Sequence, residues 1–185
     1  MIVIKRVTEL VELEGVKRLL RENHINNISK EVAANDGFLS ADYSIDFLKT
    51  MHDACPSIIA KDGDRVVGYA LVAIKEVRNH HDLLAELFNT IDTHSYKNIP
   101  LKDEKYVVVG QLCVDKDYRG QGLTKRLYKH FRECLSNDYH YCVTDVAVAN
   151  NRSLAAHVST GFVVISSITY GGITWNIVLW DWTKQ

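Results

Sequence analysis

Proline and glycine are scarce in the 185-residue sequence, which has 2 prolines and 10 glycines, and its polar tracts are short. This composition excludes collagen-like fibres and long flexible linkers. Neither sign of charge dominates, because 22 basic and 23 acidic residues are mixed along the chain and leave a formal charge of −1. We therefore expect no nucleic acid and no membrane as a partner, but small molecules or proteins.

Long apolar runs and paired cysteines are also missing. No run approaches the roughly 20 residues of a membrane-spanning helix, and residues 1–7 lack the apolar region of a signal peptide. The four cysteines form no C-x-x-C pair and sit within apolar patterns. They predict buried thiols, no disulfide and a cytoplasmic location. The length predicts a single domain over residues 1–185.

Strand and helix patterns alternate along the chain and predict an α/β fold without internal repeats. Strands are predicted at residues 2–7, 57–61, 65–74, 106–114, 141–146 and 162–169, and after a turn at Gly171 and Gly172 in a last strand that carries Trp175, Trp180 and Trp182. Helices are predicted after Thr8, after Ser44, inside residues 77–105, over 123–135 and over 151–160. The tryptophans are expected to pack the sheet rather than to form a cage for a cation.

The most informative stretch is residues 107–128, where a buried strand, a glycine-bearing turn and an amphipathic helix follow one another. Backbone N–H groups at the start of such a helix bind anions, and Gly120 and Gly122 let a phosphate come close. Arg119 adds a guanidinium at the rim. A Walker loop or a dinucleotide fingerprint fits less well, since Lys125 stands where the latter needs a small residue. The alternative is a loop whose glycines only permit a turn.

Together, the strand, the RGQGLT loop and the helix resemble the GNAT superfamily of acyl-CoA-dependent N-acetyltransferases, whose motif is Arg/Gln-x-x-Gly-x-Gly/Ala. Arg119 and Gly122 match this motif, whereas Thr124 replaces the usual glycine or alanine. A second stretch, residues 150–162, also resembles the family. Its residues in register are Asn150, Arg152, Gly161 and Phe162. The resemblance covers nearly the whole chain.

The resemblance implies a mixed, mostly antiparallel central sheet flanked by helices and splayed between its fourth and fifth strands. Acetyl-CoA would lie in this splay as co-substrate, with no metal ion. Backbone groups of Leu112, Cys113 and Val114 would pair with pantetheine, as a peptide adds to a strand edge. The pyrophosphate would be held by Arg119, Gly120, Gln121, Gly122, Leu123 and Thr124. Asn150 would reach the pantetheine arm.

The resemblance also implies direct transfer of acetyl to a primary amine. His157 stands at the position of the family's usual tyrosine acid, and we predict that it acts as the acid on the thiol side; the alternative is a histidine that only packs beside the sheet. Gln111 could orient a water. The candidate bases are Asp145, Glu76, His80 and His81. Adjacent His80 and His81 do not make a metal site.

The acceptor is selected in the family by segments that correspond here to residues 23–43 and 170–175. The helix inside residues 77–105 is a longer insertion than the usual connection, and it would either wall the acceptor site or form a dimer contact. We therefore expect a monomer or a homodimer. The alternatives to an enzyme are a non-catalytic acyl-CoA-binding regulatory module, which Thr124 and His157 motivate, and a nucleotide-binding regulator that uses the same glycine turn.

Overall fold

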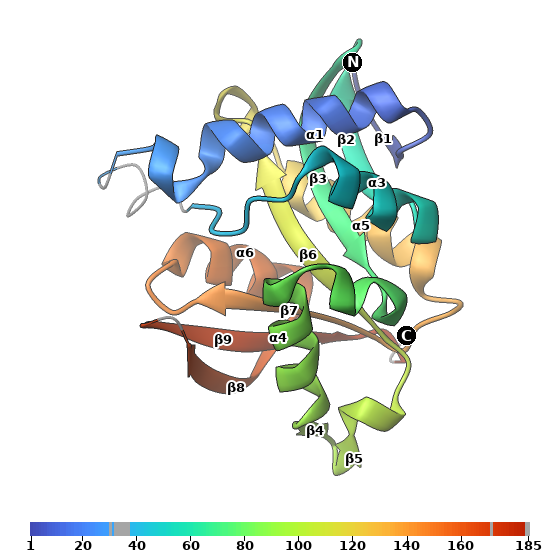
Figure 1. Cartoon of the computed structure of the whole chain (residues 1–185), viewed down its shortest axis with the longest axis vertical. Helices are drawn as coiled ribbons and strands as arrows, with labels where there is room; N and C mark the ends of the chain where they lie inside the picture. The colour runs from blue at the N-terminus through green and yellow to red at the C-terminus, as the bar shows by residue number, and fades with distance from the viewer. Residues whose placement is uncertain (30, 32–37, 171, 184–185) are drawn as a thin grey trace.

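The computed structural model describes residues 1–29, 31, 38–170 and 172–183, and Figure 1 shows the chain. The described strands of the main sheet are β1 (Ile2–Arg6), β2 (Ile58–Asp62), β3 (Arg65–Ala73), β6 (Tyr106–Val114), β7 (Tyr141–Ala147), β8 (Val163–Tyr170) and β9 (Ile173–Asp181). They form a sheet with the order β1-β2-β3-β6-β7-β9-β8. Every neighbouring pair is antiparallel except β6 and β7, which are parallel. The predicted mixed, mostly antiparallel sheet is confirmed.

Helices cover both faces of this sheet (Figure 1). The α-helices are α1 (Leu10–Asn23), α3 (Ile45–Ala54), α4 (Asp82–Asp92), α5 (Leu123–Leu135) and α6 (Asn151–Thr160). Short 3-10 helices are η1 (Ile25–Asn27), η2 (Lys75–His80), η3 (Leu101–Asp103) and η4 (Lys116–Tyr118). Side chains of α1, α3 and α4 pack on one face, and those of α5 pack on the other. The strand β3 is buried on both faces, which explains its unbroken apolar sequence.

The sheet opens between β6 and β7. The described ladder between these strands comprises three residue pairs, from Tyr106 with Tyr141 to Val108 with Val143. Beyond it, the hydroxyl of Thr144 donates a hydrogen bond of 2.8 Å to the carbonyl oxygen of Val109. Both strands then continue without pairing to each other, so the backbone edge of β6 is available to another extended chain. This is the splay that was predicted between the fourth and fifth main strands.

A one-residue bulge at Gly110 sets which side chains of β6 face which layer. Leu71 of β3 lies opposite Gln111, whereas the next residue, Val72, lies opposite Val109. Gly110 is therefore the extra residue, and the alternation of side chains shifts by one after it. As a result, Gln111 faces the layer of α1 and α3 and meets the hydroxyl of Tyr69.

The segment between β3 and β6 contains η2, α4, the two-residue strands β4 (Ser95–Tyr96) and β5 (Ile99–Pro100), and η3. Its predicted helix is α4, which His81 caps by accepting a hydrogen bond from the N–H of Leu83. Arg78 in η2 forms an ion pair of 2.9 Å with Asp92 at the end of α4. The hydroxyl of Tyr106 donates to the same carboxylate at 2.7 Å. These contacts fix α4 against the sheet.

Three of the sequence predictions concern membrane-spanning helices, disulfides and metal sites, and two concern segments that the structure describes only in part. None of the helices in the described residues is long and apolar enough to cross a membrane. All four cysteines are free thiols. The described residues contain no group of three or more His, Cys, Asp or Glu side chains placed to hold a metal ion. The predicted turn at Gly171 and Gly172 and the predicted acceptor segment 23–43 lie partly outside the described residues.

A buried carboxylate at the start of α1 makes the stability of the fold depend on pH. Burial alone would raise the pKa of Glu12, but hydrogen bonds from Lys5, Lys61 and the N–H groups of Thr8 and Glu9 outweigh it and lower the pKa to about 2. The folded state therefore favours the ionised form. This contribution is fully present above the ordinary pKa of 4.5 and is lost as the pH falls toward about 2.

We expect the free energy of unfolding to decrease as the pH falls through this window, and replacement of Glu12 by glutamine to remove much of that slope. Urea denaturation between pH 3 and 7 measures it. Glu14→Gln is the matched control, because Glu14 lies on the same helix with its side chain exposed. An equal slope in the Glu12→Gln protein and the unmodified chain contradicts the assignment.

Candidate active site

Two cavities adjoin where β6 and β7 separate. The first, the loop-side cavity, is bounded by the end of β6, by the loop that leads into α5 and by the first turns of α6. The second, the α4-side cavity, is bounded by α4, by the middle of β6 and by the unpaired end of β7. Within the described chain, six residues line both cavities: Phe38, Leu39, Leu112, Asn150, Ser153 and His157. A molecule in the loop-side cavity thus reaches the other cavity at Leu112 and His157.

The loop-side cavity contains the glycine-bearing helix start that the sequence indicated. Gly120 and Gly122 have φ angles of +77° and +72°, and no atom lies within 4 Å of where a Cβ would stand on either residue. Their role is therefore to permit the left-handed backbone and a close approach, not to relieve packing. Gly122 caps α5, and Thr124 follows in the first turn, where N–H groups have no partner within the helix. Such a helix start attracts anions.

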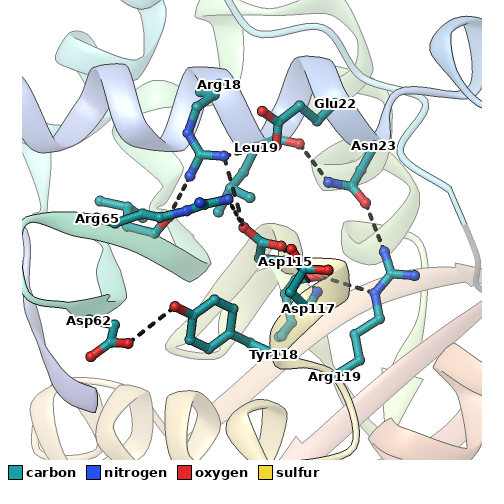
Figure 2. Close-up of polar contacts among 12 residues, drawn as sticks. Arg18, Leu19, Glu22, Asn23, Asp62, Arg65, Asp115, Asp117, Tyr118 and Arg119 are labelled. Atoms are coloured by element: carbon teal, nitrogen blue, oxygen red, sulfur yellow. Dashed lines mark hydrogen bonds and ion pairs between the residues drawn. The ribbon is translucent and has the colours of Figure 1, made fainter. Parts of the chain in front are cut away.

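The side chains of the loop are not equally directed at this cavity. Gln121 donates from its amide to the carbonyl oxygen of Asp117 at 3.4 Å and is not a lining residue. Arg119 lines the cavity, but its Nε donates to the carbonyl oxygen of Val114 at 3.2 Å and its Nη2 to Oδ1 of Asn23 at 2.7 Å (Figure 2). The guanidinium thus ties the loop to the end of β6 and to the end of α1.

His157 lies at the junction of the two cavities in a defined tautomer. Its Nδ1 is 2.7 Å from the carbonyl oxygen of Ser153, which only accepts, so Nδ1 carries the proton. Its Nε2 is 2.6 Å from the hydroxyl of Tyr128 and accepts from it. Burial lowers the pKa of His157, so the ring is neutral near pH 7. Asn150 caps the same helix, with its Oδ1 accepting from the N–H of Ser153 at 3.1 Å.

Gln111 lines the α4-side cavity with both ends of its amide engaged. The Oε1 atom accepts from the hydroxyl of Tyr69 at 2.6 Å, and the Nε2 atom donates to the carbonyl oxygen of Ala41 at 3.1 Å. A carbonyl oxygen has a second lone pair, so one acceptor position of Oε1 is left for a water or a substrate group. The side chain is therefore held rigidly at the cavity wall.

The comparisons with known proteins agree with this geometry. The model of the family described as "Acetyltransferase (GNAT) family" matches residues 14–162. The chain belongs to the GNAT family. The predicted family and the predicted activity of an acetyl-CoA-dependent N-acetyltransferase are thereby confirmed. No curated protein sequence matches the chain.

Solved structures share the fold of this GNAT protein over nearly the whole chain. Arabidopsis thaliana NAA60 in complex with acetyl-CoA is 16% identical, with a TM-score of 0.67 over 98% of this chain and 99% of that one. The ribosomal-protein-S18-alanine N-acetyltransferase of Escherichia coli is 15% identical, with a TM-score of 0.62 over 98% and 94%. The Salmonella typhimurium acetyltransferase yncA with acetyl-CoA is 13% identical, with a TM-score of 0.65 over 100% and 95%.

The four candidate bases of the GNAT protein differ in their positions. Asp145 of β7 lines the α4-side cavity, whereas Glu76, His80 and His81 are not lining residues of either cavity. The ring of His81 packs against the rings of Tyr43 and Phe47, and burial lowers its pKa. Of the four candidate bases, Asp145 is therefore the one whose side chain lines a cavity.

Two residues of this site were not found from the sequence. Tyr128 is an apolar-face residue of α5 in the sequence pattern, and nothing in that pattern shows that its hydroxyl meets His157. In the sequence pattern Thr144 is an ordinary strand residue, although its hydroxyl links β7 to β6 at the start of the splay. Of the tryptophans, Trp180 packs on Tyr128 and Phe162 as expected, while Trp175 lines the α4-side cavity.

Proposed function

We propose that the chain transfers the acetyl group of acetyl-CoA to a primary amine by direct attack at the splay between β6 and β7. The observation that carries this proposal is the continuity of three features: a strand edge without a partner, a helix start that binds anions, and a second cavity that meets the first at Leu112 and His157. A long co-substrate with an anionic end and an amide-bearing arm fits this path.

In this proposal, pantetheine lies along Leu112, Cys113 and Val114, and the pyrophosphate binds the N–H groups from Gly120 to Thr124. Asn150 donates from Nδ2 to a carbonyl of the arm while its Oδ1 caps α6. Arg119 holds the loop in shape through Val114 and Asn23, and its guanidinium lines the cavity in which the phosphate would lie. The side chain of Gln121 takes no direct part, since it is directed at Asp117.

The reaction then needs one deprotonated amine and one protonated sulfur. The amine nitrogen attacks the thioester carbonyl, the C–N bond forms, the C–S bond breaks, and the proton that the nitrogen loses on becoming an amide passes to sulfur. Asp145 accepts the proton of the ammonium group, through water oriented by Oε1 of Gln111. A backbone N–H near Leu112 stabilises the negative charge on the carbonyl oxygen. His157 hydrogen-bonds the leaving sulfur through its Nδ1–H, in place of the carbonyl of Ser153.

Tyr128 is a positioning residue in this scheme, because its O–H donates to Nε2 and so keeps the proton of His157 on Nδ1. We expect His157→Ala to lower kcat about tenfold with little change in KM for acetyl-CoA. Tyr128→Phe should lower kcat less, keep KM and alter the pH profile of kcat, because Nε2 then lacks the hydroxyl that donates to it. Steady-state kinetics from pH 5.5 to 9 test both. Unchanged kcat in both variants means that His157 only packs the site.

A mass-spectrometric acetylation screen of an amine library with this chain and acetyl-CoA tests the proposed function itself. Calorimetry with CoA accompanies it, because binding and transfer then give separate answers. Acetylated products support the proposal. Binding of CoA without any product supports the acyl-CoA-binding module instead, and preference for ATP or NAD over CoA supports the nucleotide-binding regulator. The cytoplasmic location also stays a prediction.

A further inference from the structure

We propose that the acceptor is a primary amine with one positive charge whose neighbouring carbon carries an aliphatic apolar group. This inference rests on the proposed function and concerns the α4-side cavity. The same chemistry occurs in a free amine and at the N-terminus of a peptide, so the experiment below separates these two sources.

One side of the α4-side cavity is an apolar wall. The helix α4 contributes Leu83, Leu84 and Leu87, and Trp175 of β9 stands among the other lining residues. Leu84 and Leu87 are buried, at 1% and 5% exposure, and belong to the core. Leu83 is half-buried and packs against the same core. An apolar group that enters this cavity is removed from water on several sides, which is favourable in proportion to the area covered.

Apart from Asp145, the polar side chains of β6 and β7 that line this cavity offer few further hydrogen bonds to a ligand. Gln111 is engaged by Tyr69 and Ala41, and the hydroxyl of Thr144 donates to Val109. An amino sugar would bury several hydroxyls here without enough partners, and each unsatisfied hydroxyl is costly. An apolar substituent meets no such cost.

The charge of the cavity selects one cation. Among the described residues that line it, Asp145 is the only carboxylate, and neither lysine nor arginine is present. One carboxylate matches one ammonium group, whereas a polyamine would bring additional charges against the leucines of α4 and lose their hydration. The acceptor amine therefore places its nitrogen near Asp145 and its apolar group against α4.

The wall is also held in place before any substrate arrives. The ion pair between Arg78 and Asp92, the hydrogen bond from Tyr106 to Asp92 and the cap at His81 fix both ends of α4. A fixed apolar wall discriminates by size and polarity, because it does not rearrange for a poorly matched group. Of the two roles expected for this helix, the structure therefore favours that of a wall of the acceptor site.

The first experiment compares acceptors with the full chain and acetyl-CoA. The free amines are leucinamide, spermidine and glucosamine, and the peptides are matched sequences that begin with leucine or with aspartate. We expect kcat/KM for leucinamide, for the leucine peptide or for both to exceed that of the polar acceptors about tenfold or more. The ratio of kcat/KM for leucinamide to kcat/KM for the leucine peptide shows whether the acceptor is a free amine or the N-terminus of a peptide. Preference for spermidine, glucosamine or the aspartate peptide overturns the inference and leaves the proposed function standing, whereas no acetylation of any amine overturns both.

The second experiment alters the wall. Leu83→Glu adds a carboxylate at a half-buried position of α4, so we expect kcat/KM for leucinamide to fall about tenfold and that for 1,4-diaminobutane to rise. The readout is the ratio of the two acceptors, which loss of folded protein does not change. Leu83→Ala adds no charge, so it should lower kcat/KM for leucinamide without raising kcat/KM for 1,4-diaminobutane. Leu10→Glu is the control, since Leu10 is 54% exposed on α1 and lines neither cavity. An unchanged ratio in Leu83→Glu overturns the inference.

Discussion

Replacement of Thr124 by aspartate should weaken CoA binding about 100-fold or more without unfolding the protein. Thr124 lies in the first turn of α5 and lines the loop-side cavity. An acidic side chain in the first turn stabilises a helix, so thermal stability should stay the same or rise. The same carboxylate would lie within a few ångströms of a bound pyrophosphate, where repulsion between unit charges amounts to about 4 kcal/mol near a protein surface. Isothermal titration calorimetry with CoA measures the loss.

Thr124→Asn is the matched control for this experiment, because it has the shape of the aspartate variant without its charge. We expect the asparagine variant to bind CoA within a few-fold of the unmodified chain. If both variants bind CoA as tightly as the unmodified chain, no anion binds at the start of α5, and the proposed placement of CoA is then wrong. Equal losses in both variants attribute the effect to the shape of the side chain instead.

Replacement of Asp115 by alanine should lower the free energy of unfolding by about 2 kcal/mol. Asp115 lies directly after β6, and its side chain is 4% exposed. Its carboxylate accepts from Arg65 at 2.8 Å and lies 3.9 Å from Arg18, while its other oxygen accepts from the N–H of Asp117 at 3.2 Å (Figure 2). Its removal leaves two guanidinium groups and a backbone N–H without this partner. Urea denaturation measures the loss, and we expect Tm to fall by roughly 4 to 8 °C.

Asp117→Ala provides the control, since Asp117 lies two residues further on with its side chain exposed. It should change the free energy of unfolding by only about 0.5 kcal/mol. Because Asp115 also fixes the first residues of the loop, CoA affinity should fall in Asp115→Ala at temperatures where the protein is still folded. A stability equal to that of Asp117→Ala means that the two arginines find other partners.

The parts of the site that come from adjacent residues could be predicted from the sequence. The apolar run of β6, the glycines of the loop and the amphipathic pattern of α5 lie within a single stretch, and each follows from local backbone chemistry. The same holds for the cap at Ser44. The positions of the strands and helices followed from periodicity because two layers of helices cover one sheet.

Contacts between distant segments could not be predicted in this way. Tyr128 and His157 are 29 residues apart in the sequence, and their hydrogen bond joins α5 to α6. The hydrogen bond from Arg119 to Asn23 joins residues that are 96 positions apart. The sequence suggested a guanidinium at the rim of a phosphate site, but only the packing of α1 against the loop shows where two of its donors go. Likewise, the apolar pattern of α4 predicted a helix and left open which cavity it would line.

The extra residue at Gly110 has a consequence for how this active site can change by mutation. Substitutions at positions 111–114 alter one wall at a time, since each position keeps its orientation. Insertion of a single residue between Gly110 and Gln111 would instead exchange the two sides at once, presenting Gln111 to the layer of α5 and Leu112 to that of α1, whereas loss of Gly110 would only remove the bulge. Diversification of this enzyme is thus expected to proceed by replacement within β6, with changes of length confined to the connection that carries α4.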